Sequence, residues 1–384
     1  MTAEELTCPA CAAPIAVGDT FCEACGAQLS GAQLSGAPLS GDSSPDAQLP
    51  VAEPQDVPVA GAPAVDTTAP IPRTVKSSAV CAQCGGRILD DGFCGTCGQK
   101  ARSPRDHWSE QPAPWVGGVC DRGIVHAANE DAMALAATAD GSLAILVVCD
   151  GVTSAPHSDR AALAAALAAC GQLTAVPTLS ATSVAASVNY WTEALESAAN
   201  EANSAAVGVA HTMGDPPEPP SCTFVAAIVA DSLITVAWCG DSRAYWLPDA
   251  GTPRQLTVDH SLGTELMASG KSRAEAEADP AFHTITRWLG NDSVDHTPEV
   301  ASQPIDGPGW LLVCSDGLWN YASAVDEMAA RVAQLSSTTD SDPLPLAAAL
   351  VEWANAAGGH DNVTAALARC VPSLRFQQER TSGG

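Results

Sequence analysis

The run Leu143-Ala-Ile-Leu-Val-Val-Cys149 is followed directly by Asp150 and Gly151. Seven apolar residues in a row have the length of a buried strand. A carboxylate at the end of such a strand is poorly solvated, so it has to be paired or bound to a metal ion. This strand end is therefore a candidate functional site. The evidence for it is stronger if the same pattern recurs elsewhere in the chain.

The pattern recurs at three other places along the chain. Asp316 follows Leu311-Leu-Val-Cys-Ser, Asp361 precedes an apolar run that starts at Val363, and Asn129-Glu130-Asp131 precedes another apolar stretch. A single Asp-Gly pair is typical of an ordinary turn, but turn chemistry does not explain four acidic sites joined to hydrophobic runs. Oxygen ligands with no His or Cys among them favour Mg²⁺ or Mn²⁺ over zinc.

The pattern of apolar runs from Trp115 onward predicts an α+β fold with antiparallel sheets. Strands early and late enclose two consecutive alanine-rich helices, at 158–171 and 182–208, and the strands between 223 and 247 are expected to pair antiparallel because short turns join them. The other predicted strands are 143–149, 310–314 and 363–368, and the other predicted helices are 262–270, 324–335 and 343–357.

Composition divides the chain into six segments. The segment 28–78 is rich in Ala, Pro, Gly and Ser and has no sustained period, so it is predicted to be a disordered linker. The predicted segments are a first zinc-ribbon half at 1–27, this linker at 28–78, a second ribbon half at 79–99, a short linker at 100–113, the large domain at 114–372 and a polar tail at 373–384.

Eight of the 15 cysteines form four Cys-x-x-Cys pairs before residue 100. Two such knuckles can close a tetrahedral Cys₄ site without an open position, as in structural zinc sites. The spacing leaves open whether the four knuckles form two separate ribbons or pair with one another. The predicted ligands of two structural zinc ions are Cys8, Cys11, Cys22, Cys25, Cys81, Cys84, Cys94 and Cys97.

Seven segments in chain order resemble the successive motifs of the metal-dependent (PPM) protein phosphatases. They are Asp121–Asp131, Asp150–Ser154, Cys239–Tyr245, Asp259–Ser261, Ile285–Gly290, Cys314–Trp319 and Asp361–Thr364. The resemblance covers about two thirds of the chain. It implies a sandwich of two antiparallel sheets flanked by helices, and a serine/threonine protein phosphatase activity.

The resemblance also assigns roles to the acidic residues. It implies that Asp150 bridges two Mn²⁺ or Mg²⁺ ions, that the Gly151 carbonyl binds one of them, and that Asp316 and Asp361 complete the other. A hydroxide held between the metals would attack phosphorus. Glu130 is expected to act through water and Asp131 to support the ligands. A third metal is allowed, with Asp215 or Glu218 as candidate ligands.

The sequence departs from the family at two places. His126 stands where the family usually has an arginine that binds the substrate phosphate, so His126 and the nearby Arg122 are the candidate phosphate ligands. Val152-Thr153-Ser154 replaces residues that usually include two glycines. Both departures concern the phosphate-binding part of the site and leave the metal-binding aspartates in place.

The charge of the chain restricts its partners. A net charge of −27 disfavours nucleic acid and anionic membranes, and the start of the chain lacks the features of a signal peptide, so a cytoplasmic protein acting on phosphoserine and phosphothreonine proteins is expected. The ribbons are expected to dock or tether a protein partner. Two alternatives remain open: a phosphatase-like adapter that binds phosphoproteins, and a phosphatase of a small phosphorylated molecule.

Overall fold

The computed structural model describes residues 80–81, 84–89, 93–98, 101, 103–177 and 183–372 of the 384-residue chain. The chain divides into two units, Met1–Asp66 and Thr67–Gly384, and the first lies wholly outside the described residues. The predictions for segments 1–27, 28–78 and 373–384, including the four cysteines before residue 26, also lie outside them.

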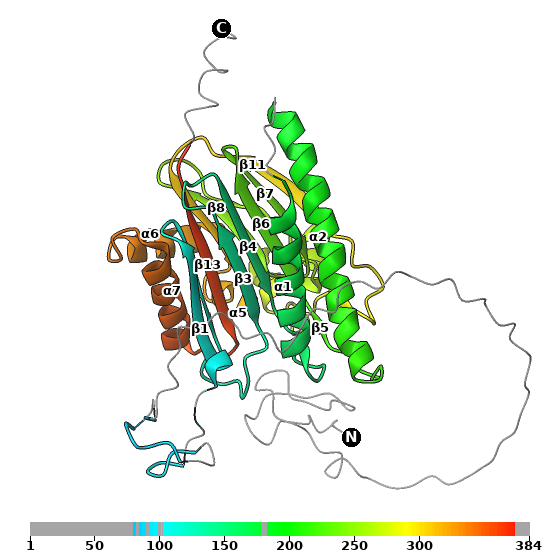
Figure 1. The fold of residues 1–384 in the computed structure, drawn as a ribbon, viewed down its shortest axis with the longest axis vertical. Coiled ribbons are helices and arrows are strands. Elements are labelled where there is room, and N and C mark those ends of the chain that lie inside the picture. The colour runs from blue at the N-terminus through cyan, green and yellow to red at the C-terminus, as the bar shows by residue number, and fades with distance from the viewer. Residues whose placement is uncertain are drawn as a thin grey trace, which may run out of the picture. The chain divides into compact units, whose positions relative to one another are not determined.

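Residues 103–372 are built around two antiparallel sheets (Figure 1). One sheet has six strands in the order β1-β2-β13-β12-β8-β9, and the other has five in the order β11-β7-β6-β4-β3. A further small sheet pairs β5 with β10. The strands are β1 (His107–Ala113), β2 (Val116–Asp121), β3 (Ala132–Ala137), β4 (Leu143–Cys149), β5 (Ser221–Cys222), β6 (Phe224–Ala230), β7 (Leu233–Cys239), β8 (Arg243–Pro248), β9 (Arg254–Gln255), β10 (Leu289–Gly290), β11 (Glu299–Pro304), β12 (Gly309–Cys314) and β13 (Val363–Cys370).

The two large sheets enclose one apolar core between them. Val116, Leu146, Val236 and Leu311 come from four different strands and are all buried in it. The outer faces of the central strands are also buried, which explains why β4, β6 and β7 are continuous apolar runs and do not alternate with polar residues. The predicted α+β sandwich is confirmed.

Helices cover the outer face of each sheet (Figure 1). Helices α1 and α2 pack on the sheet of β3, β4 and β7, and α7 packs on β2 and β13 of the other sheet. Small alanine side chains at buried positions let α1 approach the sheet closely. The helices are η2 (Pro104–Asp106, a 3₁₀ turn), α1 (Ser158–Ala175), α2 (Val184–Thr212), α3 (Leu262–Ala268), α4 (Arg273–Glu277), α5 (Asp316–Trp319), α6 (Val325–Ser336) and α7 (Pro343–Ala357).

The prediction that the strands between 223 and 247 pair in succession was only partly correct. β6 and β7 form an antiparallel pair, but β8 pairs with β12 in the other sheet. The chain crosses between the sheets at Gly240, whose φ is 113° and where a Cβ atom would lie 2.7 Å from the Thr223 side chain. A short connection in the sequence does not distinguish a hairpin from such a crossing, because both need only a few residues.

The expected linker at 100–113 is also different in the structure. From Ser103 onward the chain belongs to the large domain, and β1 pairs with β2 from His107 to Glu110 and again at Ala113. β1 lies at the edge of its sheet, a position that tolerates Pro112. The proline and the charged residues of this stretch are typical of a linker, so the composition concealed the strand.

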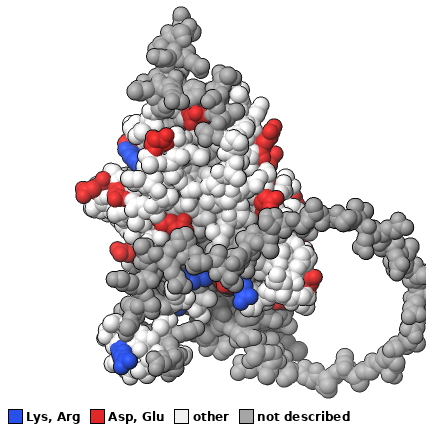
Figure 2. Space-filling model, viewed as in Figure 1, with Lys and Arg blue, Asp and Glu red and all other residues white. Residues whose placement is uncertain are grey.

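The described surface of the large domain carries mostly acidic charge. Figure 2 shows scattered acidic side chains and few basic ones on the face in view. Within the part of the chain that the structure describes, no helix is both long and apolar enough to cross a bilayer.

Candidate active site

Four aspartates lie at strand ends and share one electrostatic environment. Asp150 follows β4, Asp316 opens α5 after β12, Asp361 precedes β13 and Asp131 precedes β3. The carboxyls of Asp150 and Asp316 lie within hydrogen-bonding reach of each other. Strands of both sheets therefore contribute to one acidic cluster, which we call the aspartate cluster (Asp131, Asp150, Asp316 and Asp361).

The aspartate cluster is poorly stabilised as a set of anions. Burial, and then the charges of Asp131, Asp316 and Asp361, hold the pKa of Asp150 well above its usual value. Burial and the charge of Asp316 raise the pKa of Asp361 to about 6. Since each carboxylate disfavours ionisation of its neighbours, the cluster requires a compensating positive charge or bound protons at neutral pH.

Two carboxylate oxygens in the cluster lack a hydrogen-bond partner although they are buried: Oδ1 of Asp131 and Oδ1 of Asp316. The other oxygen of Asp131 accepts hydrogen bonds from Ser315 Oγ at 2.7 Å and Thr364 Oγ1 at 2.6 Å. A buried acceptor without a partner is costly, and a bound cation removes that cost. The residues at the site therefore fit divalent metal ions.

Gly151 lies where two acidic loops approach each other. A Cβ atom at this position would lie 2.7 Å from the carbonyl oxygen of Glu130. Next to it, the hydroxyl of Thr153 hydrogen-bonds the Glu130 side chain, whose pKa is raised by burial. One of the two unusual side chains of the Val152-Thr153-Ser154 loop thus supports an acidic residue of the site.

Asn362 holds the Glu130 loop from the side of β13. Its Oδ1 accepts a hydrogen bond from the Glu130 amide at 2.7 Å, and its Nδ2 donates to the carbonyls of Arg122 and Ala128. Asn362 is almost completely buried. The sequence placed this residue beside Asp361 but gave it no role, because its contacts are with residues more than 230 positions away.

His126 and Arg122, the candidate phosphate ligands, differ in where they lie. Nε2 of His126 is 3.4 Å from Oδ1 of Asp361, so its ring borders the aspartate cluster. Arg122 instead donates from Nη1 to the carbonyl of His126 at 2.8 Å and lies 3.8 Å from the Asp106 carboxylate. The guanidinium of Arg122 is thus engaged in holding the loop that carries His126.

Asp241 joins the acidic site, which the sequence did not predict. The segment 240–243 connects β7 to β8, and Arg243 is the basic residue nearest to Asp241 in the sequence. Arg243 instead forms a buried ion pair with Asp259 at 2.6 Å and lies 3.5 Å from the centre of the Trp319 ring. The pKa of Asp241 is raised by burial and then by the charge of Asp316.

A sequence pattern could have identified Asp241. It follows Cys239-Gly240 at the end of β7, just as Asp150 follows Cys149 and Asp316 follows Cys314-Ser315.

Asp215, one candidate ligand of a third metal, pairs with His211 at 2.6 Å, and both side chains are more than half exposed.

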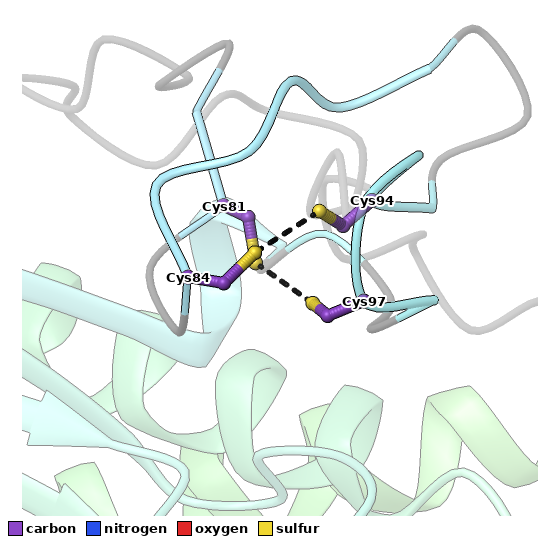
Figure 3. A group of neighbouring side chains, drawn as sticks. All are labelled: Cys81, Cys84, Cys94 and Cys97. Carbon is purple, nitrogen blue, oxygen red and sulfur yellow. Dashed lines mark hydrogen bonds between the residues drawn. The ribbon is translucent and has the colours of Figure 1, made fainter.

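The described cysteine knuckles form a compact sulfur site (Figure 3). The ligand atoms of Cys81, Cys84, Cys94 and Cys97 all lie within 4.8 Å of one another. The pairs Cys81–Cys97 and Cys84–Cys94 have sulfur separations of 3.6 and 3.5 Å. Sulfurs bound tetrahedrally to one Zn²⁺ at about 2.3 Å would be separated by roughly 3.8 Å, so the set fits zinc.

The backbone of the ribbon is arranged for metal-bound thiolates. Gly85 and Gly98, each one residue after a knuckle, have φ of 71° and 73°, a conformation that glycine adopts without steric cost. Backbone hydrogen bonds from Cys97 and Thr96 lower the pKa of Cys94 to about 6. These four cysteines therefore pair as two successive knuckles and form one site.

The aspartate cluster is less tightly gathered than the cysteines. Among the described residues, the four cysteines are the one group of three or more ligand-type side chains that meets the same 4.8 Å criterion.

Comparison with known proteins agrees with this geometry. A family model described as protein phosphatase 2C matches residues 124–355. A second model, described as double zinc ribbon, matches residues 8–98.

Individual relatives match about two fifths of the chain. The serine/threonine phosphatase stp of Listeria welshimeri is 37% identical over 150 residues, which is 38% of this chain and 55% of that protein. The protein phosphatase PhpP of Streptococcus pneumoniae is 35% identical over 149 residues, 38% of this chain and 56% of that protein. The chain thus spans about half the length of the curated relatives it matches.

Solved structures extend the likeness over the whole large domain. The serine/threonine phosphatase PstP/Ppp of Mycobacterium tuberculosis matches 67% of this chain and 98% of its own, with 26% identity and a TM-score of 0.54. A structure of the PstP catalytic domain in complex with two manganese ions matches with 26% identity and a TM-score of 0.52, covering 67% of this chain and 97% of that one.

Proposed function

The chain belongs to the protein phosphatase 2C family, and from this premise we propose that it hydrolyses phosphoserine and phosphothreonine in proteins. The observation that carries the proposal is the aspartate cluster, in which buried carboxylate oxygens without hydrogen-bond partners face a shared excess of negative charge. Hydrolysis of a phosphate monoester needs cations at such a place, because the substrate brings further negative charge.

The proposed metal ligands are the carboxylates of Asp150, Asp316 and Asp361 and the carbonyl of Gly151. Hard oxygen donors of this kind favour Mn²⁺ or Mg²⁺. Divalent cations bound there would lower the pKa of water and offset charge on the phosphoryl oxygens. The manganese-containing PstP structure supports this choice of ion.

The residues of the chain divide the remaining tasks. Glu130 lies at the rim of the cluster, held by Asn362 and Thr153, where it can orient water. Asp131 is fixed by Ser315 and Thr364 and adds negative charge behind the ligands. We assign phosphate binding to His126, whose ring borders Asp361, and loop positioning to Arg122.

The zinc ribbon is proposed to dock a protein partner. Its apolar residues Val80, Leu89 and Phe93 are each about half exposed, at 52, 46 and 45%. The ribbon residues contain no part of the aspartate cluster, so docking and hydrolysis would be separate tasks.

The decisive experiment compares Mn²⁺-dependent hydrolysis of a phosphothreonine peptide by wild type, Asp150→Asn and His126→Ala. Asp150→Asn removes the carboxylate of Asp150 and is expected to reduce kcat by about 100-fold or more, since metal ligands and charge stabilisation contribute on that scale. His126→Ala is expected to raise KM and leave most of kcat. If wild type and Asp150→Asn are equally inactive with added metal, the proposed activity is wrong.

A further inference from the structure

Arg105 makes an unusual set of contacts just outside the matched phosphatase segment. It lies in η2, between the ribbon and β1, whereas the family model begins at residue 124. Its Nε donates to the carbonyl of Asn129 at 3.1 Å, and its Nη2 donates to the carbonyls of Asp131 at 3.0 Å and Asp159 at 2.7 Å. One guanidinium therefore binds three backbone oxygens, two in the loop that carries Glu130 and one in the first turn of α1.

The first loop is the one that presents Glu130. Asn129 and Asp131 flank Glu130, so Arg105 binds the carbonyls of both residues next to it. Asn129 returns a hydrogen bond from Nδ2 to the carbonyl of Arg105 at 3.0 Å. Asn362 binds the Glu130 amide. The Glu130 loop is thus fixed by two different parts of the chain.

The second loop connects Asp150 and Gly151 to α1. Asp159 lies in the first turn of α1, and the preceding Ser158 donates from its hydroxyl to the carbonyls of Val152 and Ala155. The contact of Arg105 with the Asp159 carbonyl therefore connects η2 to the loop that follows Asp150. Nε of Arg105 also lies 3.9 Å from the Asp159 carboxylate, so an ion pair adds to the hydrogen bond.

Arg105 is itself held in place. The guanidinium lies 5.5 Å from the centre of the buried Trp108 ring, and its side chain is only 16% exposed. Ser103 caps η2, and its amide is bound by the carboxylate of Asp106. The fork geometry of arginine suits binding of several acceptors at fixed angles, which a lysine ammonium does not reproduce.

We infer that Arg105 is a positioning residue that sets the affinity of the aspartate cluster for divalent cations, by fixing the Glu130 loop and the Asp150 loop relative to each other. The inference rests on the proposed function for its metal site, but it concerns cation binding and not turnover. Four residues separate Ser103, which caps η2, from Gly98 of the ribbon in the sequence.

The test measures Mn²⁺ binding to the full chain by calorimetry below the melting temperature, with the zinc sites filled. Arg105→Ala is expected to weaken Mn²⁺ binding by about 10-fold, the lower end of the range for residues that orient metal ligands. Arg105→Lys should recover part of the affinity. The matched control is Arg254→Ala. Arg254 lies in the edge strand β9 and donates a hydrogen bond to Gln303 of β11, so its loss should leave Mn²⁺ binding unchanged.

Turnover distinguishes the inference from the proposed function. At saturating Mn²⁺ the Arg105 variants should regain kcat to within about twofold, because the ligands themselves are intact. A wild type that binds Mn²⁺ without hydrolysing phosphopeptides would refute the proposed function and leave the inference standing if Arg105→Ala weakens binding. Unchanged Mn²⁺ affinity in both Arg105→Ala and Arg105→Lys would refute the inference, even if melting temperatures fall.

Discussion

At the scale of single residues, Gly151 leaves little room between the loop of Glu130 and the loop that follows Asp150. A methyl group there would lie 2.7 Å from the Glu130 carbonyl oxygen and 3.0 Å from the backbone of Ser158. Both contacts are shorter than ordinary van der Waals distances, and both neighbours are backbone or fixed by hydrogen bonds. The loops have to move apart to accept any side chain, and the carbonyl proposed as a metal ligand would move with them.

Gly151→Ala is therefore expected to weaken Mn²⁺ activation by about 10-fold or more, because the ligand carbonyl and Glu130 are both displaced. The measurement is the Mn²⁺ concentration that gives half-maximal hydrolysis. Gly171→Ala is the control: Gly171 lies in α1 with open space at its Cβ position, so alanine should stabilise the helix by up to about 1 kcal/mol and leave the metal dependence unchanged. Equal metal dependence in both variants would show that the loop is more pliable than these distances indicate.

Single residues also mark the limit of reasoning from the sequence. Asp150, Asp316 and Asp361 could be found because each lies within two residues of an apolar run, and the run places it at a strand end. Asp241 also follows such a run, but Arg243 lies two positions away and suggested an ion pair between the two. In the structure Arg243 pairs with Asp259. Arg105 and Asn362 could not be found, since their partners lie at sequence separations that no local pattern records.

At the scale of elements, β1 joins the two sheets at the start of the large domain. It pairs with β2 in one sheet, and its Glu110 side chain accepts a hydrogen bond from the Leu135 amide of β3 in the other at 2.9 Å. Burial raises the pKa of Glu110 to about 7, although the Leu135 hydrogen bond opposes the shift. An ionisable group thus lies at the junction of two sheets.

The sign of its pH dependence follows from the raised pKa. Below about pH 4.5 the carboxyl is protonated in the folded and unfolded states alike, so it does not lower the free energy of unfolding. As the pH rises toward 7, the unfolded chain releases the proton while the folded chain retains it, so stability falls. Glu110→Gln keeps an acceptor for Leu135 and should be more stable than wild type at pH 8 by on the order of 1 kcal/mol, with little difference at pH 4.5.

Thermal melting at the two pH values measures this difference, and about 2–4 °C is expected at pH 8 for a domain of this size. The matched control is Glu193→Gln on α2, which is solvent-exposed and should show no such dependence. If the melting temperature of Glu110→Gln rises equally at both pH values, the protonation of Glu110 does not change on folding.

Elements differ in how well the sequence predicts them. The bounds of β4 and α7 agree with those expected, because a continuous apolar run and an Asp-Pro start define their ends. β1 and the crossing at Gly240 were missed for different reasons. The proline and charges of β1 are typical of a linker, although its partner β2 is the next strand in the chain. The crossing depends on the pairing of β8 with β12, a strand far along the chain that local composition does not reveal.

At the scale of the whole molecule, the two proposed metal sites differ in what they would contribute to folding. The large domain encloses extensive apolar cores, whereas in the described ribbon residues only Cys81 and Cys94 are buried hydrophobic side chains. A segment this small has too little core to fold alone, so zinc would supply its folding free energy. The large domain has no such need of its divalent cations in order to fold.

Removal of the described zinc site should therefore affect one part of the chain and spare the other. Cys94→Ser combined with Cys97→Ser is expected to abolish one equivalent of bound zinc, measured by metal analysis of the purified protein. The main melting transition should shift by no more than about 1 °C and kcat on a short phosphopeptide should be retained, because the aspartate cluster, η2 and both sheets lie within residues 103–372. A fall in the main transition would instead show that the ribbon contributes to the stability of the large domain. In that case Arg105 and η2, which follow the ribbon in the chain and bind both acidic loops, would be the first contacts to examine by the same Mn²⁺ titration.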